Sequence, residues 1–431
     1  MEKCIGIRRE DKNKWERRVP LTPAHVQELK SIFGITTQIQ PFPTRAFSDQ
    51  EYEEAGAIVT EDLSKCPAVF AVKEIPIDFL LPDKTYIFFS HTIKSQEYNM
   101  PLLQKIIDLN CTLIDYECIK EESGRRLVFF GVYAGIAGMI ETLHGMGIKY
   151  KKMGVDTPFL KVMQPYEYKN VEHAKQEIKK IGEEIKENGL PQELLPFTIG
   201  FTGYGNVSNG AQEIFDLLPH EMITPDKLKN LSSDNQNLIY KVVFKEEHMF
   251  EPVDKNADFE LQDYFDHPEK YKSKFGTYIP NLDVLVNCIF WHDKCPKLVT
   301  KKFLSNNPDI KLKMVGDISC DVNGAIEFVS KITTPDQPAL TFDVKTGQIF
   351  DGYEGSGPSV IAIDNLPCEL PVDSSNGFSE ALHSLVPLIV DIDLNKSFDE
   401  LELPHEIKNA IIVYKGELTP NFCYLKKSLE S

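Results

Sequence analysis

One segment of the 431-residue chain limits its fold more than any other, and it has the sequence TIGFTGYGNVSNGAQEIF (residues 198–215). A short apolar run, a turn with glycines and apolar residues at helical spacing predict a strand, a tight turn and a helix. Gly203 and Gly205 let a phosphate approach the main chain, and the N–H groups that begin the helix face that anion. In the dinucleotide fingerprint G-x-G-x-x-G the third glycine position is Ser208 here, and the next glycine is Gly210. A tight turn without a ligand is the competing interpretation.

Short apolar strands alternate with amphipathic helices along the rest of the chain. This alternation predicts the α/β class, with a mostly parallel sheet covered by helices. A polar segment with many aromatic residues is expected to be an insertion at about residues 224–280. The expected strands are Cys4–Ile7, Thr36–Gln40, Ala68–Val72, Thr85–Phe89, Thr112–Asp115, one near Met222, Val284–Cys288 and Lys313–Asp317. The expected helices are Pro23 to about Lys30, with Thr22 as N-cap, then Asn99–Leu109, Tyr133–Met146 and a region around Glu380–Val390.

Composition and charge exclude several classes of protein. The 42% hydrophobic and 26% charged fractions are those of an ordinary globular protein. The net charge of −18, without a long basic run, argues against a nucleic-acid partner. No apolar run is long enough to span a membrane.

The cysteines and the N-terminal sequence indicate a cellular compartment. The nine cysteines include no CxxC pair, which predicts reduced thiols and no metal site. The start MEKCIGIRRE lacks the apolar core of a signal peptide. We therefore expect a cytoplasmic protein, or a mitochondrial one if a leader has been removed.

Titratable residues follow two of the expected strands. Lys73 and Glu74 come directly after Ala68–Val72, and His91 follows Thr85–Phe89, with Lys94 three residues later. Ligands of parallel α/β sheets bind at the carboxyl ends of strands, so these side chains are candidates for one site. A histidine, or a lysine of lowered pKa, transfers protons at neutral pH. A solvated lysine and a histidine that caps the backbone are the competing interpretations.

Paired arginines and strand-end acids add to the candidate chemistry. A guanidinium group of Arg17–Arg18 or Arg125–Arg126 matches a carboxylate with two hydrogen bonds, although surface ion pairs are an alternative. Asp115, Glu117 and Asp317 lie at or near strand ends. These acids either hold an ammonium group or cap the turns that follow.

These residues belong to motifs that occur in a fixed order along the chain. The motifs are RREDKNKWERRVPLTP, AVKEIP, FFSHTIKSQ, LIDYE, GRRLVFFGVYAG, GMIETLHGMG, GYGNVSNGA, HPEKYKSKF, NCIFW, DISCDVNGAIEF and IDNLPCELP. Together they resemble the lysine–2-oxoglutarate reductase half of α-aminoadipic semialdehyde synthase. They are more distantly similar to the fungal saccharopine dehydrogenases and to the alanine dehydrogenase/transhydrogenase family. The resemblance extends from Ile5 to about Leu425, and HPEKYKSKF points to the reductase branch.

The resemblance implies two Rossmann-like doubly wound domains with a cleft between them. Residues 1–133 and 367–431 would form the substrate domain, and residues 134–366 the dinucleotide-binding domain with its insertion at about 224–280. The implied reaction is the first step of lysine degradation, in which L-lysine, 2-oxoglutarate and a reduced nicotinamide cofactor give saccharopine. An amino-acid dehydrogenase of the alanine dehydrogenase type and a non-catalytic relative are the alternatives. Whether the chain forms a homo-oligomer stays open.

The resemblance also implies roles for individual residues. Lys73 and His91 match the family's catalytic pair and would divide the proton transfers between them. The implied substrate-binding residues are Arg18, Glu74, Lys94, Glu117 and Arg126. The expected cofactor-binding residues are Gly203, Gly205, Asn206, Val207, Thr224, Asn287 and Asp317.

The strand after the glycine-turn helix bears on the choice of cofactor. In dinucleotide-binding folds an acid at the end of this strand accepts a hydrogen bond from the ribose 2′-hydroxyl of NAD. Here the strand is expected to end at the neutral Thr224, and Lys227 and Lys229 follow. This pattern and the reductase branch predict a preference for NADPH, with NAD as the alternative. The argument reverses if the strand ends at Glu221.

Overall fold

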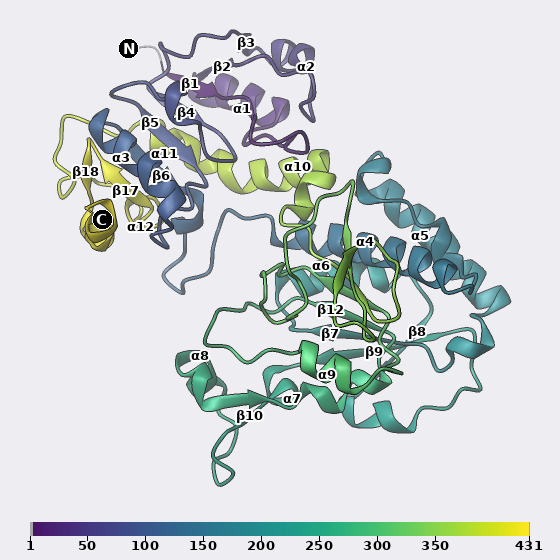
Figure 1. Cartoon of the computed structure of the whole chain (residues 1–431). Coiled ribbons are helices and arrows are strands. Elements are labelled where there is room, and N and C mark those ends of the chain that lie inside the picture. Colours follow the sequence, from purple (N-terminus) through teal and green to yellow (C-terminus); the bar gives the residue numbers. More distant parts are fainter. Residues whose placement is uncertain (1–2, 431) are drawn as a thin grey trace. The chain divides into compact units, whose positions relative to one another are not determined.

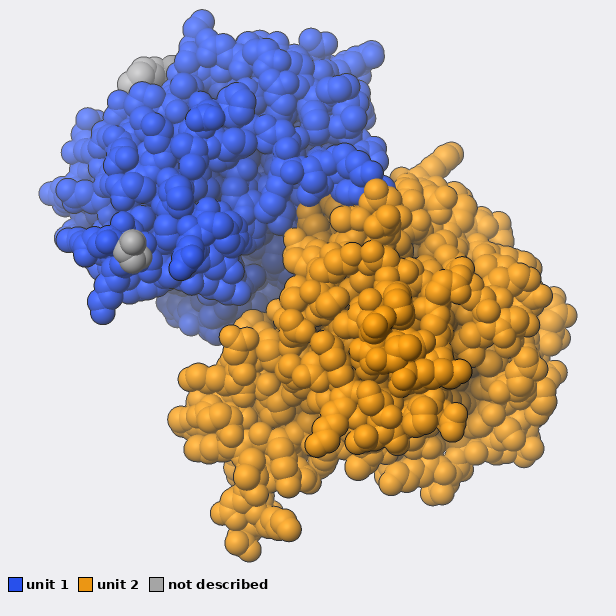
Figure 2. All heavy atoms as spheres, viewed as in Figure 1, with its two compact units in different colours: residues 1–130, 371–431 blue, residues 131–370 orange. Residues whose placement is uncertain are grey.

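The computed structural model describes residues 3–430 and divides the chain into two compact units (Figure 1). Unit 1 consists of residues 1–130 and 371–431, and unit 2 of residues 131–370, as Figure 2 shows in blue and orange. Each unit contains its own eight-stranded sheet and its own helices. Within residues 3–430 no helix has both the length and the hydrophobicity that a membrane crossing requires.

The sheet of unit 1 has the strand order β18-β17-β6-β5-β4-β1-β2-β3. Strands β1 to β6 run parallel, and β17 joins β6 antiparallel. The strands are β1 (Cys4–Ile7), β2 (Thr36–Ile39), β3 (Ile58–Val59), β4 (Ala68–Phe70), β5 (Thr85–Phe88), β6 (Thr112–Asp115), β17 (Ile411–Tyr414) and β18 (Glu417–Leu418). The helices are α1 (Pro23–Phe33), α2 (Asp49–Glu54), α3 (Met100–Asp108), α10 (Pro371–Leu382), α11 (Val386–Val390), α12 (His405–Lys408) and α13 (Lys426–Leu429).

Local sequence signals explain where the first helices of unit 1 begin and end. Helix α1 begins with Pro23, whose fixed φ suits the first turn, and ends before Gly34, whose φ of 65° terminates the helix. Ser48 begins α2 with a capping box that includes Glu51. Strands β1, β5 and β6 are buried at every position, as expected for parallel strands covered on both faces.

The sheet of unit 2 has the strand order β15-β14-β16-β13-β12-β7-β9-β8. The six strands from β16 to β8 in this order run parallel, and β14 and β15 extend the sheet antiparallel. The strands are β7 (Thr198–Thr202), β8 (His220–Ile223), β9 (Ile239–Phe244), β12 (Val284–Asn287), β13 (Met314–Asp317), β14 (Ala339–Phe342), β15 (Ile349–Asp351) and β16 (Ser359–Ile361), with a separate pair β10 (Phe250–Pro252) and β11 (Tyr271–Ser273). The helices are α4 (Gly131–Lys152), α5 (Val171–Asn188), α6 (Asn206–Phe215), α7 (Glu246–Met249), α8 (Leu261–Asp266) and α9 (Lys301–Asn306). The predicted α/β class is confirmed.

Helices α4 and α6 of unit 2 pack closely through glycines. A Cβ atom on Gly210 would lie 2.2 Å from the carbonyl oxygen of Val132, and one on Gly135 would lie 2.0 Å from that of Val207. Ser208, at the third position of the glycine fingerprint, is buried. Gly210 therefore serves helix–helix packing, which explains why a glycine stands two residues beyond the expected position.

The segment expected to be an insertion, residues 224–280, also contains a core strand of the sheet. Strand β9 lies between β7 and β8, and Figure 1 labels all three side by side. This strand was not recognisable from the sequence because Lys241 interrupts its apolar run. In the structure Lys241 is 2% exposed and pairs with Asp216. Strand β8 is consequently an edge strand two positions from β7.

Candidate functional site

In unit 1, His91 and Glu74 lie in contact near the ends of two neighbouring parallel strands. Strands β4 and β5 pair in parallel, with Phe70 opposite Ile87. Glu74 follows β4, and its Oε1 lies 2.6 Å from Nδ1 of His91, which follows β5. Lys12 Nζ donates to the other carboxylate oxygen of Glu74 at 2.9 Å. Since the side chains of His91 and Glu74 are 30% and 13% exposed, the pair is partly screened from water.

The cations around Glu74 fix its charge. Burial opposes ionisation of this carboxyl, but hydrogen bonds and charges from His91 and Lys12 outweigh burial and lower the pKa to about 2. His91 has a φ of 51°, in the left-handed region that few non-glycine residues adopt. The side chain of Asn99 donates to the His91 carbonyl oxygen at 3.1 Å. Strained backbone of this kind is concentrated at functional sites.

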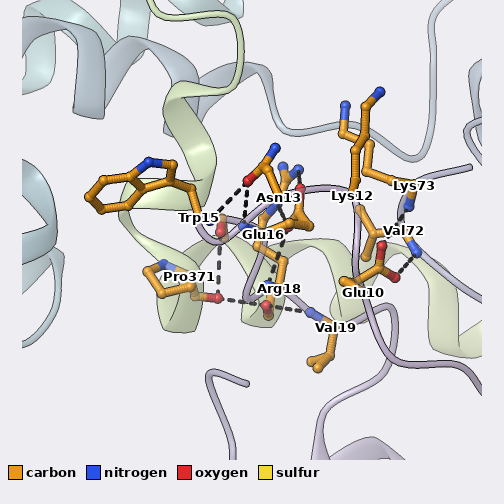
Figure 3. Close-up of polar contacts among 12 residues, drawn as sticks. Glu10, Lys12, Asn13, Trp15, Glu16, Arg18, Val19, Val72, Lys73 and Pro371 are labelled. Atoms are coloured by element: carbon orange, nitrogen blue, oxygen red, sulfur yellow. Dashed lines mark hydrogen bonds and ion pairs between the residues drawn. The ribbon is translucent and has the colours of Figure 1, made fainter. Parts of the chain in front are cut away.

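Glu10 holds the backbone that carries Lys73, as Figure 3 shows. Its two carboxyl oxygens accept hydrogen bonds from the N–H groups of Val72 at 2.6 Å and Lys73 at 3.0 Å. Burial and the charge of Glu16 raise the pKa of Glu10 to about 8, although the two N–H donors favour ionisation. The role of Glu10 was not predictable from the sequence, because one acid in the charged run RREDKNKWERR shows no sign of being buried.

Arg18, expected to bind a substrate carboxylate, lies in an internal ion pair. Its Nε and Nη2 donate to the two carboxylate oxygens of Glu16 at 2.8 and 2.6 Å. The side chains of Arg18 and Glu16 are 1% and 0% exposed. The guanidinium group also lies 4.1 Å from the ring centre of Phe130. Arg18 therefore supports the interior of unit 1 in this structure, and its predicted contact with substrate stays a prediction.

Three of the remaining predicted residues of unit 1, Asp115, Glu117 and Arg126, lie around the end of β6. Arg126 pairs with Glu117, and Arg126 is 47% exposed while Glu117 is 12% exposed. The N–H group of Glu117 donates to Asp115 at 2.7 Å, and that of Ser90 donates to the same carboxylate at 2.9 Å. Asp115 thus caps the turns after β5 and β6, which is one of the two roles that the sequence allowed for it. Lys94 is exposed.

In unit 2 the glycine turn lines a cavity of about 570 Å³. Gly203 has a φ of 84°, which requires glycine, and Gly205 has an extended φ of −80°. A Cβ atom added at Gly205 would meet open space. Helix α6 begins at Asn206 without a side-chain cap on its first N–H groups. An open backbone cradle beside uncapped N–H groups fits the pyrophosphate of a dinucleotide.

Two other predicted cofactor residues form a buried chain of hydrogen bonds across strand ends. Thr202 donates to Asn287 at 2.7 Å, and Asn287 donates to Asp317 at 2.8 Å. These side chains end β7, β12 and β13 and are at most 2% exposed. Burial raises the pKa of Asp317 to about 7, although the hydrogen bond from Asn287 favours the ionised form. These hydrogen bonds hold together the carboxyl ends of the strands, and the glycine turn begins at the end of β7.

The structure shows where the strand used for the cofactor prediction lies. That strand, which follows the glycine-turn helix, is β8; it ends at Ile223, directly before Thr224 as expected, but it lies at the edge of the sheet. The strand beside β7 is β9, and Glu246 lies two residues beyond its end. Glu246 lines the cavity together with Gly203 and Gly205, whereas Thr224 is not among the lining residues. Burial and a hydrogen bond to Glu246 raise the pKa of Tyr204, the residue between the two glycines.

Comparisons with solved structures define the class of the fold. An L-alanine dehydrogenase aligns with a TM-score of 0.65 over 99% of both chains at 18% identity. A transhydrogenase from Sinorhizobium meliloti aligns with a TM-score of 0.58 over 97% of this chain and 100% of its own, at 15% identity. Residues 6–137 match the family model "Alanine dehydrogenase/PNT, N-terminal domain". The chain therefore has the alanine dehydrogenase/transhydrogenase fold.

Curated relatives place the chain more narrowly. It is 38% identical to the α-aminoadipic semialdehyde synthase of Arabidopsis thaliana, over 99% of this chain and 42% of the relative. The mitochondrial protein of that name from Bos taurus is 37% identical over 99% of this chain and 48% of its own length. The chain thus spans less than half the length of these two relatives. A saccharopine dehydrogenase [NAD(+), L-lysine-forming] from Schizosaccharomyces pombe is 28% identical over 88% of this chain and 91% of its own. The predicted resemblance to α-aminoadipic semialdehyde synthase is confirmed, and the chain is related to that family over nearly its whole length.

Proposed function

We propose that the chain condenses L-lysine with 2-oxoglutarate and reduces the resulting imine to saccharopine, the first step of lysine degradation. The observation that carries this proposal is the contact between His91 and Glu74 beside Lys73, within a chain that matches a semialdehyde synthase over 99% of its length. The substrates are L-lysine and 2-oxoglutarate, and the product is saccharopine. Cytoplasmic location and oligomeric state stay predictions.

The residues of unit 1 suit the proton transfers of this reaction. The ε-amine of lysine loses a proton before it attacks the ketone of 2-oxoglutarate, and the carbinolamine accepts a proton as water leaves. Ionised Glu74 binds Nδ1 of His91 and leaves Nε2 as the nitrogen for proton exchange. We assign the second acid–base role to Lys73, whose backbone Glu10 holds in place. A nicotinamide cofactor supplies the hydride when bound.

Cations near the same strand ends suit the carboxylates of the substrates. Arg126 and Lys94 are accessible to solvent, and each adds a positive charge to an otherwise acidic chain. Glu117, paired with Arg126, would orient its guanidinium group or hold the α-ammonium group of lysine. Arg18 could bind a substrate carboxylate only if it gave up one of its two hydrogen bonds to Glu16.

In unit 2 the glycine turn would hold the cofactor. Gly203 and Gly205 leave room for the pyrophosphate, and the N–H groups of Asn206 and Val207 at the start of α6 would bind it. Asn287 and Asp317 would hold the neighbouring strand ends in position beside the bound cofactor.

Glu246 bears on which nicotinamide cofactor is preferred. A carboxylate beside the glycine turn accepts a hydrogen bond from a ribose 2′-hydroxyl and repels a 2′-phosphate. The position of Glu246 in the cavity therefore favours NADH and opposes the NADPH preference that Thr224 had suggested. We propose NADH as the preferred cofactor.

A spectrophotometric assay at about 340 nm with each reduced cofactor tests the function. Oxidation is expected only when lysine and 2-oxoglutarate are both present, with a higher kcat/KM for NADH than for NADPH. Turnover with ammonia and pyruvate, and none with lysine, would instead establish an amino-acid dehydrogenase of the alanine dehydrogenase type. If neither pair of substrates is turned over, the remaining interpretation is a relative without catalytic activity.

A further inference from the structure

Two histidines and a glutamate from opposite ends of the sequence meet at one point on unit 1. His25 lies in the first turn of α1, Glu380 near the end of α10, and His383 directly after α10. One nitrogen of each ring and one oxygen of the carboxylate all lie within 4.8 Å of one another. His25 Nε2 is 3.2 Å from Oε2 of Glu380, and the two rings stack with centroids 4.2 Å apart.

We propose that His25, Glu380 and His383 form a binding site for a divalent transition metal of the zinc type, which joins α10 to α1. Two imidazoles and one carboxylate are a donor set that suits such ions. No metal site was expected from the sequence, because only cysteine spacing was considered and these ligands come from distant segments. The proposal does not depend on the reaction proposed above.

Hydrogen bonds of the two Nδ1 atoms direct the ligand nitrogens. Nδ1 of His383 lies 2.8 Å from the carbonyl oxygen of Glu380. A carbonyl oxygen only accepts, so this nitrogen carries the proton and the Nε2 lone pair of the neutral ring is available to a metal. Nδ1 of His25 lies 2.6 Å from Oγ of Ser379, which leaves Nε2 as the nitrogen nearest Glu380. Partners of this kind orient the histidines of metal sites and fix their tautomers.

The backbone around the cluster is held by hydrogen bonds between the two segments. Oγ of Ser379 also accepts from the N–H group of Thr22, the residue before α1, at 2.9 Å. One turn earlier on α10, Oγ of Ser375 accepts from the N–H group of Val19 at 3.0 Å. The ligand-bearing segments are thus already joined before any ion binds. The ion would lie between His25 and Glu380, and the stacked rings would tilt until their Nε2 lone pairs converge.

The metal would stabilise the part of α10 that supports Arg18. Phe378, two residues before Glu380, stacks on Phe130 with ring centroids 4.4 Å apart. Phe130 in turn lies under the guanidinium group of Arg18. Binding to the folded state alone raises the unfolding temperature, so occupancy is expected to raise the stability of unit 1.

Zinc titration of the full-length, EDTA-treated protein tests the proposal. We expect one equivalent of Zn²⁺ to bind in competition with a chromogenic chelator, and zinc to raise the unfolding temperature. The double variant His25→Ala/His383→Ala is expected to lose this equivalent. Glu380→Gln is expected to bind at least about tenfold more weakly, and since Glu380 is 74% exposed this variant should fold normally.

Two matched variants separate this site from other zinc ligands. His267→Ala removes an exposed histidine of unit 2, and Cys423→Ser removes an exposed thiol, and both are expected to bind zinc like the wild type. The proposal is overturned if the wild type binds no zinc at micromolar concentration. It is equally overturned if Glu380→Gln and the double histidine variant keep the wild-type affinity and the zinc-dependent shift in unfolding temperature.

Discussion

The polar cluster of unit 1 (Glu10, Lys73, Glu74 and His91) and the glycine turn of unit 2 are suited to ligands in different ways. Around Lys73 and His91, side chains act on one another: His91 and Lys12 keep Glu74 charged, and Glu10 binds the backbone of Lys73. At the turn, the main chain is left open at Gly205. The first arrangement suits proton transfer and the second suits binding of an anion. Substitutions should therefore affect rate in unit 1 and affinity in unit 2.

The largest effect is expected from the acid–base residues. Lys73→Met and His91→Gln should each lower kcat by about 10²–10⁴-fold, because each removes a proton donor or acceptor. Cofactor affinity, measured by fluorescence titration, should be unchanged. Lys105→Met on α3 and His173→Gln on α5 are the matched controls and should retain wild-type kcat. A variant at Lys73 or His91 with near wild-type kcat would show that the residue takes no part in proton transfer.

The glycine turn should show the converse behaviour. Gly205→Val places a side chain in the open space of the cavity, and its extended backbone accepts valine without strain. Cofactor affinity should fall at least about tenfold, since each hydrogen bond lost from a charged phosphate costs about 1.5–3 kcal/mol. Folding, followed by circular dichroism, should survive.

Gly210→Val is the contrasting variant for the same turn. Its Cβ atom would lie 2.2 Å from the carbonyl oxygen of Val132, so it should destabilise unit 2. If Gly205→Val folds and binds cofactor normally, the turn is structural only, and the contrast between the two units is lost.

Single side chains beside the turn should set the choice of cofactor. If Glu246 accepts the ribose 2′-hydroxyl, Glu246→Gln should weaken NADH binding and shift the ratio of kcat/KM for NADH over NADPH toward NADPH by about tenfold. Equilibrium binding of the two cofactors gives a readout apart from turnover. Glu247→Gln, at the next position of α7, is the control. An unchanged ratio in Glu246→Gln would remove Glu246 from cofactor selection.

Features set by neighbouring residues could be predicted from the sequence, whereas features set by tertiary contacts could not. The bounds of β1 and β6 and the start of α1 at Pro23 were predicted correctly, because apolar runs and capping residues act within a few positions. The order of strands was not predictable in this way. The strand that follows the glycine-turn helix is β8, and β9 lies between it and β7.

Buried charge explains the other failures. Lys241 made β9 hard to recognise, because a lysine in an apolar run normally indicates an exposed position. Here the carboxylate of Asp216 pairs with its buried charge. Glu10 and the pair of Arg18 with Glu16 were hidden in a charged run for the same reason. Only tertiary contacts distinguish such groups from solvated ones. By contrast, Lys73 and His91 could be proposed as site residues because the ends of parallel strands can be located from sequence.

The last expected effect concerns stability, not rate or affinity, and comes from Glu10. The pKa of its carboxyl is about 8 in the folded protein against 4.5 in the unfolded chain. Between these values the folded state binds more protons, so this group stabilises the fold fully below pH 4.5, and its contribution is lost as pH rises to about 8. The slope is at most about 1.4 kcal/mol per pH unit for one proton.

Glu10→Gln should flatten that decline in the free energy of unfolding, measured in urea at several pH values. The variant should also be less stable at low pH, because an amide offers one acceptor oxygen to the two N–H groups of Val72 and Lys73. Glu53→Gln, on an exposed position of α2, should keep the wild-type slope. If Glu10→Gln keeps that slope as well, the carboxyl is ionised throughout this range. The cluster of unit 1 would then carry one more negative charge beneath Lys73.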